Sequence, residues 1–203
     1  MNKPVKTLPP GYMLSGSVSL QKTADLIPML VWSLVLPALT IPAIFLVLRG
    51  SEATRNFPST FSVSNGGNFL QLLGGILLVT VVMIVLHEGL HGLVFWLTTH
   101  EAPKFDFKFY YASASPGDWY LPRRPFLVAT LLPLVAITAA GLLLLPLAGA
   151  FLRYLLILLV VFNASGAAGD LVVTLRLAKL PPGTLAHDTG AEVTFFSPAP
   201  SGE

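Results

Sequence analysis

Long runs of apolar residues dominate the chain and are separated by short polar segments. Four runs stand out, at residues 26–48, 69–99, 126–148 and 151–178. Each is at least as long as the roughly 20 helical residues that cross a bilayer core of about 30 Å. The last two runs are joined almost without a linker, so they should form an antiparallel helical hairpin. The pattern therefore predicts four membrane-spanning helices.

The segment between the second and third runs has a different pattern. From Lys104 to Phe109, polar and apolar residues alternate with a period of two, which is typical of a half-buried strand. Turn-forming residues follow at 115–118, and residues 119–121 are expected to return as a second strand. This hairpin has two interpretations. It is either an aromatic anchor at the membrane interface, or an edge strand that holds a substrate in extended form through Phe105, Phe107 and Phe109.

The composition supports a membrane environment. Charged residues make up 11% of the 203-residue chain and apolar residues 54%, with a mean hydropathy of +0.73. Ordinary soluble domains carry about 25% charged residues, and a soluble chain of this size could not bury so much apolar surface. Residues 1–180 are expected to form one polytopic membrane domain. Residues 181–203, rich in Pro, Gly and small polar residues, are expected to form a loosely ordered tail.

The Lys and Arg residues indicate which helix ends face the cytoplasm. Because positive charge is enriched in cytoplasmic loops, nine such residues against three favour both termini in the cytoplasm. The expected fold class is therefore an all-α integral membrane protein with about four transmembrane helices and a short cytoplasmic-side β-hairpin between the second and third. The nine are Lys3, Lys6, Lys22, Lys104, Lys108, Arg123, Arg124, Arg176 and Lys179, and the three outer residues are Arg49, Arg55 and Arg153.

Two features of the composition limit the kinds of chemistry and partner that the chain can have. The chain has no cysteine, which removes disulfides, thiolate ligands and a thiol nucleophile. Any metal must therefore be held by His, Asp or Glu. The net charge of +2, without a cluster of basic residues, gives no indication of a nucleic-acid partner.

One group of ionisable residues lies inside an apolar run, the segment His87-Glu88-Gly89-Leu90-His91. On a helix, His87 and His91 share a face one turn apart, which suits two nitrogen ligands of one Zn²⁺. Glu88 can reach a metal-bound water as a general base. Ionisable residues in a membrane segment are costly and indicate function. The alternatives are a polar cluster that ties helices together and a pathway for protons or ions.

Asp170 is the candidate for a third metal ligand, because it is the only acidic residue of the fourth run. His91 and Asp170 each lie about eight residues before the cytoplasmic end of their runs, which places both about 12 Å below the same boundary. The other candidates lie outside the apolar runs and are expected to be solvated. They are Glu101, Glu192, His100, His187 and Asp188.

Small residues at 164–169 precede Asp170. They allow another helix to approach closely, and they weaken the helix, so a local break is expected there. Asn163, seven residues before Asp170, falls on about the same helical face. Its amide has two interpretations: it holds a substrate carbonyl, or it forms an ordinary interhelical hydrogen bond.

These residues together resemble known membrane proteins. A histidine pair in one membrane helix, with Asn163 and Asp170 in a later one, is similar to the site-2-type intramembrane zinc proteases, although Gly169-Asp170-Leu171 replaces the Leu-Asp-Gly of that family. The closer resemblance is to small bacterial membrane proteins described as putative zincin peptidases, which pair a His-Glu-x-x-His span with a later Gly-Asp span. It covers roughly residues 69–177 and implies a zinc enzyme of the bacterial cytoplasmic membrane.

The leading hypothesis is an intramembrane zinc metalloendopeptidase that acts on a membrane protein or peptide within the lipid bilayer. His87, His91 and Asp170 would hold Zn²⁺, Glu88 would be the catalytic base, and Asn163 would orient the scissile carbonyl. The alternative is a membrane transporter or metal-handling protein in which the same cluster binds an ion in transit. Transport folds are often built from internal repeats, and the four runs show no obvious repeat.

Overall fold

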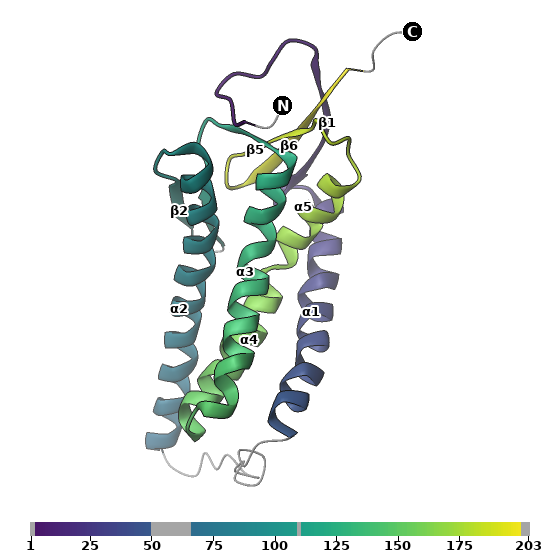
Figure 1. Cartoon of the computed structure of the whole chain (residues 1–203). Coiled ribbons are helices and arrows are strands. Elements are labelled where there is room, and N and C mark those ends of the chain that lie inside the picture. The colour runs from purple at the N-terminus through teal and green to yellow at the C-terminus, as the bar shows by residue number, and fades with distance from the viewer. Residues whose placement is uncertain (1–2, 50–65, 109–110, 200–203) are drawn as a thin grey trace.

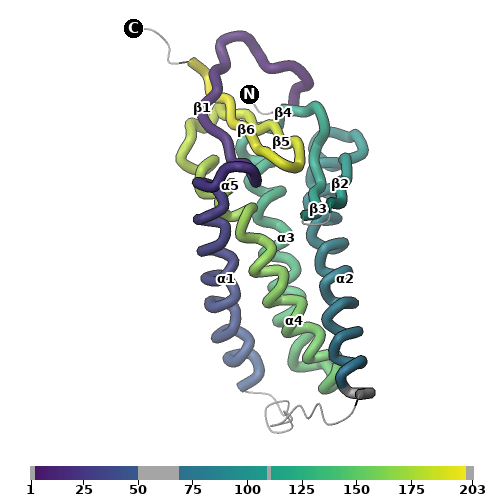
Figure 2. The backbone as a smooth tube through the Cα atoms, turned by 180° about the vertical axis from the view of Figure 1, so that it is seen from behind, coloured from purple at the N-terminus to yellow at the C-terminus, as the bar shows by residue number. Residues whose placement is uncertain are grey.

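The computed structural model describes residues 3–49, 66–108 and 111–199. Within these residues there are five α-helices, the last two of which follow each other end to end as a bent pair. Most of the strands gather at one end of the molecule, called the sheet end below (Figures 1 and 2). The helices are α1 (Thr23–Arg49), α2 (Gly66–Thr99), α3 (Arg123–Leu144), α4 (Ala150–Gly166) and α5 (Ala168–Ala178).

Three of the helices, α1, α2 and α3, are each long and apolar enough to cross a membrane. The helices α4 and α5 are long and apolar enough to cross a membrane when they are taken together as one span, which is bent by 43°. Many large apolar side chains on α1 and α2 point away from the protein: Leu46 is 72% exposed and Leu77 is 65% exposed. Apolar surface of this extent is stable in lipid rather than in water. Three helices, or four when the bent pair counts as one span, are thus long and apolar enough to cross a membrane, which is consistent with the predicted multi-pass protein of about four spans.

The break between α4 and α5 falls at Ala167, inside the stretch of small residues where it was expected. Ala167 has φ −74° and ψ 5°, and its N–H still donates to the carbonyl of Asn163 at 2.9 Å. The chain therefore keeps a helical hydrogen bond at the end of α4 while the axis bends. As a result, Asp170 lies in the first turn of a new helix rather than in the middle of a straight one.

The predicted hairpin of α3 and α4 is present, joined by the 3₁₀ turn η2 (Leu145–Leu147). The two helices approach closely at Gly141, where an added Cβ would clash with Val160. At the connection, buried Arg153 donates to the carbonyl of Ala148 at 2.6 Å. This bond satisfies a backbone oxygen that the end of the η2 turn would otherwise leave without a partner.

Four strands form an antiparallel sheet in the order β1-β6-β5-β4. They are β1 (Tyr12–Ser19), β4 (Tyr120–Pro122), β5 (Leu185–Asp188) and β6 (Glu192–Pro198). The sheet corrects two expectations: the chain is not all-α, and the segment 181–203 is not a loosely ordered tail where β5 and β6 form. Its inward side chains include Val18 and Phe195, which are 3% and 1% exposed and join a core with Phe126 of α3. Burial of these apolar groups stabilises the sheet.

The hairpin after α2 exists, but with a different partner strand from the one expected. The strand β2 (Lys104–Lys108) pairs with β3 (Tyr111–Ser115), not with residues 119–121. The expected turn around Gly117 connects β3 to β4, and β4 joins the other sheet by pairing with β5. Phe109, the third aromatic residue expected to hold substrate, lies outside the described residues.

A buried ion pair fixes the start of α1 to α5. The carboxylate of Asp25, which is 3% exposed, contacts the guanidinium of Arg176 at 2.6 Å and accepts the N–H of Ser19 at 2.8 Å. Arg176 also donates to the carbonyl of Ser17 at 2.8 Å. Helix α5, which carries Asp170, is therefore tied to both α1 and β1.

Candidate metal centre

Helix α2 presents its two histidines to the inside of the helix bundle. His87 and His91 are 6% and 7% exposed, although they lie on a helix whose other faces are largely open. The four-residue spacing places the two imidazoles one turn apart in an edge-to-face arrangement, with ring centroids separated by 4.9 Å. One helix therefore supplies two nitrogen donors on a single inward face.

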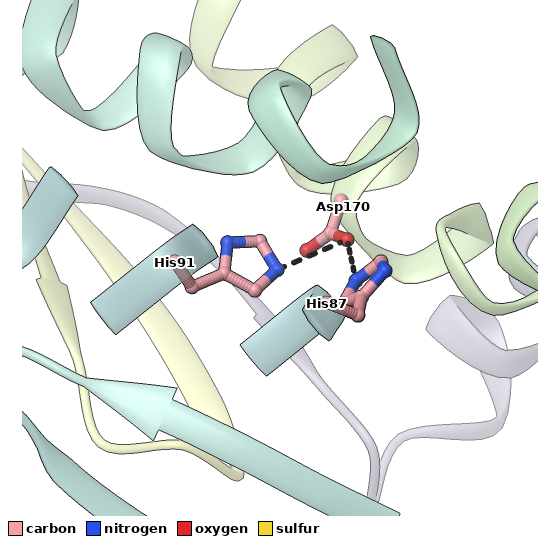
Figure 3. Close-up of side chains that lie close together, drawn as sticks. All are labelled: His87, His91 and Asp170. Carbon is pink, nitrogen blue, oxygen red and sulfur yellow. Dashed lines mark hydrogen bonds and ion pairs between the residues drawn. The ribbon is translucent and has the colours of Figure 1, made fainter. Parts of the chain in front are cut away.

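Asp170 reaches the two histidines from α5, as Figure 3 shows. Its Oδ2 lies 3.0 Å from Nε2 of His87 and 3.4 Å from Nε2 of His91. The bend at Ala167 places Asp170 in the first turn of α5, where an anionic side chain is also favoured by the helix dipole. The candidate ligand set predicted from the sequence is thus brought together, with donor atoms that all lie within 4.8 Å of one another.

The other ring nitrogen of each histidine is fixed by a protein acceptor. Nδ1 of His91 lies 2.9 Å from the carbonyl of Ala129, which can only accept a hydrogen bond. Nδ1 of His87 lies 3.0 Å from Oδ1 of Asn163, whose own amide nitrogen donates to the carbonyl of Pro133 at 3.2 Å. Both Nδ1 atoms therefore carry hydrogen, and both Nε2 atoms point toward Asp170.

This arrangement suits a bound cation. When the imidazoles are neutral, their Nε2 lone pairs face a carboxylate oxygen, and that contact is repulsive unless positive charge lies between the three atoms. Two imidazole nitrogens and a carboxylate oxygen form a typical donor set for a catalytic zinc ion, which keeps a further position open. The hydrogen bonds to Ala129 and Asn163 are the outer contacts that commonly orient zinc-binding histidines. The cluster can therefore hold a metal ion.

Glu88 lies beside this cluster without belonging to it. Its carboxylate is half-buried and accepts the backbone N–H of Ala114, in β3, at 2.7 Å. Glu88 also lines a cavity together with His91 and Asp170. A carboxylate in this place can exchange protons with a molecule in the cavity, as a general base requires.

A cavity of 670 Å³ opens onto the cluster. Its walls come from α1, α2, α3, the bend between α4 and α5, the strands β1 and β3, and the turn between β5 and β6. Apart from the polar groups at the metal centre, most of its lining is apolar, with Leu26, Met29 and Leu30 of α1 on one side and Phe95 of α2 on another. Mostly apolar cavities with a few polar groups at one point are typical substrate sites.

The other residues singled out from the sequence lie elsewhere. Asn163 is 0% exposed, and its amide is engaged by His87 and Pro133, so the interhelical hydrogen bond is the interpretation that the structure shows. Its amide nitrogen also lies 3.5 Å from Oγ1 of Thr138. Phe105 and Phe107 in β2 are 49% and 64% exposed and are not among the residues that line the cavity.

Two features of the cavity were missed by sequence analysis. The first is β3, whose small residues gave no strand pattern. The second is Asp188, which was expected to be solvated but lines the cavity with Glu88 and Asp170. The sequence Asp188-Thr189-Gly190 is typical of a turn, and a turn is what it forms. Of the other residues expected to be solvated, His100 is exposed, whereas His187 is half-buried and stacks on Tyr120.

The fold and the donor set together define a multi-pass membrane protein with a His-Glu-x-x-His helix and a carboxylate from a second helix, the arrangement of a metallopeptidase. A family model described as "Putative zincin peptidase" matches residues 80–185, just over half of the chain, and the protein belongs to this family. The match includes His87, Glu88, His91 and Asp170 and ends before Asp188. No curated protein and no solved structure matches the chain.

Proposed function

We propose that the protein is an intramembrane zinc metalloprotease that hydrolyses peptide bonds of membrane proteins. The observation that carries this proposal is the convergence of His87, His91 and Asp170 at a cavity that also exposes Glu88. The cavity walls are formed largely by membrane-spanning helices, which suits a substrate that is itself embedded in lipid. We place the sheet end and both termini in the cytoplasm, because nine of the twelve Lys and Arg residues belong to that end.

The residues have distinct roles in this proposal. His87, His91 and Asp170 would hold Zn²⁺, which supplies Lewis-acid chemistry by polarising a carbonyl and making water more acidic. Glu88 takes a proton from the attacking water and later gives it to the leaving amine, so that one water and one peptide bond become a carboxylic acid and an amine. Asn163 and the carbonyl of Ala129 hold the two imidazoles in the orientation that this chemistry needs.

The exposed edge of β3 provides a way to hold an unfolded stretch of substrate. The N–H of Ala114 points to Glu88, away from β2. In an antiparallel strand the N–H and C=O of a residue point to the same side and alternate residues share a side, so Ala112 also turns its backbone groups toward the cavity. We propose that the substrate pairs with this edge of β3, beside the catalytic groups, rather than with β2.

A cleavage assay with purified protein tests the function. The protein is reconstituted into liposomes together with single-span membrane peptides, and fragments are identified by mass spectrometry. Cleavage within or next to the apolar segment is expected, with loss of activity on zinc chelation and recovery on adding zinc. If no peptide of a broad panel is cleaved and the same liposomes transport Zn²⁺ or protons, the protease proposal is wrong and the transport alternative is favoured.

The role of the β3 edge is tested by Ala112→Pro, which removes one N–H that faces the cavity and leaves the ladder between β2 and β3 intact. One lost hydrogen bond of about 0.5–1.5 kcal/mol should raise KM by about 2- to 10-fold and leave kcat and zinc content unchanged. Ala112→Val is the matched control, because it adds bulk but keeps the N–H. Equal KM values for the proline and valine variants would show that the substrate does not use this edge.

A further inference from the structure

Asp188 is a charged residue in the cavity that the proposed hydrolysis does not use. It is the last residue of β5, at the turn into β6, and it lines the cavity with Glu88, His91 and Asp170. This turn rests on β3, because a Cβ added at Gly190 would lie 2.6 Å from Oγ of Ser113. The contact fixes Asp188 on the sheet side of the metal centre.

Only part of the Asp188 carboxylate is used by the protein itself. Its Oδ1 accepts the N–H of Gly190 at 2.7 Å, which closes the turn. In the part of the chain that the structure describes, no Lys, Arg or His side chain forms an ion pair with Asp188. No buried side-chain oxygen among these residues lacks a partner, so the second oxygen of Asp188 is open to the cavity.

Among the acidic residues that line the described part of the cavity, Asp188 is the one whose negative charge no neighbouring positive charge balances. Glu192, another acidic residue of the lining, pairs with Lys22 at 3.0 Å. If two neutral imidazoles and Asp170 held a zinc ion, the site would keep one net positive charge, which Glu88 would offset. Burial raises the pKa of Asp188 to about 7, so its ionised form is disfavoured until a cation lies next to it.

We propose that Asp188 determines substrate specificity by binding a Lys or Arg side chain that lies on the sheet side of the scissile bond. The inference rests on the proposed protease function, since it assigns a preference to that same cavity. Membrane helices commonly carry Lys and Arg at their cytoplasmic ends. A substrate helix that lies along the apolar cavity wall would bring such a residue to the sheet end, where Asp188 accepts it.

The experiment measures peptide binding, so that it does not depend on turnover. Capped peptides with about 20 apolar residues carry Lys, Gln or Glu at successive positions of one flank, and their affinity is measured by fluorescence anisotropy for the Glu88→Gln protein in detergent. At one position or two neighbouring positions, Lys should bind about tenfold more tightly than Gln, which corresponds to about 1.4 kcal/mol. Adding Asp188→Asn should remove this difference, and adding Asp188→Lys should reverse it in favour of Glu.

The variants are chosen to leave the fold intact. Asparagine keeps the side-chain oxygen that accepts the N–H of Gly190, so the turn should persist. Asp118→Asn is the matched control: it removes one negative charge from a side chain that is 86% exposed and outside the cavity lining, and it should leave the Lys preference unchanged. Asp188→Asn should also keep about one zinc per chain, because Asp188 is not one of the proposed ligands.

The outcomes separate this inference from the protease proposal. Cleavage without any Lys preference, or a Lys preference that survives Asp188→Asn, would overturn the role of Asp188 and leave the protease intact. Loss of zinc in Asp188→Asn would also overturn it, since Asp188 would then be a ligand. A Lys preference that disappears in Asp188→Asn, in a protein that cleaves no peptide, would support the binding role and count against proteolysis.

Discussion

Replacing Glu88 by glutamine is expected to slow cleavage of a membrane substrate by about 10²- to 10⁴-fold, the usual contribution of a general base. Glutamine has nearly the same size, and its amide oxygen can still accept the N–H of Ala114 that holds Glu88 in place. It cannot take a proton from water at neutral pH. The geometry of the cavity should therefore survive, and only the proton transfer should be lost.

This expectation is measured as initial cleavage rates in liposomes, with zinc content determined on the same samples by elemental analysis. Zinc should remain at about one per chain, because Glu88 is not one of the three converging ligands. Glu101→Gln is the matched control, since Glu101 is an exposed residue just beyond the end of α2. Full activity in Glu88→Gln would disprove the role of Glu88 as the base, and loss of zinc would make it a ligand instead.

The membrane helices and the metal cluster could be predicted because each depends on local pattern or on the cost of burial. A run of some 20 apolar residues is itself a signal for a spanning helix. The spacing of His87 and His91 puts them on one helical face, and a lone carboxylate such as Asp170 in an apolar run needs a partner. Even the break before Asp170 follows from the small residues that precede it.

The sheet could not be predicted in this way because its pairing is not local. The strands β1 and β6 pair in a register that places Tyr12 opposite Pro198, although these residues lie near opposite ends of the chain. Such a long-range contact leaves no periodic pattern in the sequence. The wrong prediction of the strand that pairs with β2 has a related cause. The expected partner strand ends up beside β5, which forms only once the C-terminal segment has folded back.

The position of Asp188 shows the same limit at the level of a single residue. Its sequence context predicts a turn correctly, and most aspartates in turns are solvated. What brings it into the cavity is the packing of the β5–β6 turn on β3, at Gly190 and Ser113. The candidate metal ligands can thus be found from chemistry and spacing, whereas the residues that shape the rest of the cavity depend on the tertiary fold.

The largest effect on metal content is expected from Asp170→Asn. Wild-type protein purified with added zinc should contain about one zinc per chain, and the variant should contain almost none. The amide of asparagine carries no charge, so the two imidazole nitrogens would lose the anionic ligand that lies 3.0 and 3.4 Å from them. His87→Ala and His91→Ala should lose zinc in the same way, because each removes one of the three donors.

Asp188→Asn is the matched control for this experiment, since it is the same substitution in the same cavity but outside the ligand set. Circular dichroism and size-exclusion chromatography establish that each variant remains folded. Zinc that persists in Asp170→Asn but is lost in His87→Ala would place the third ligand elsewhere. Wild-type protein without any bound metal would refute the zinc site, and the cluster of His87, His91 and Asp170 would then be a polar contact between helices or part of an ion pathway.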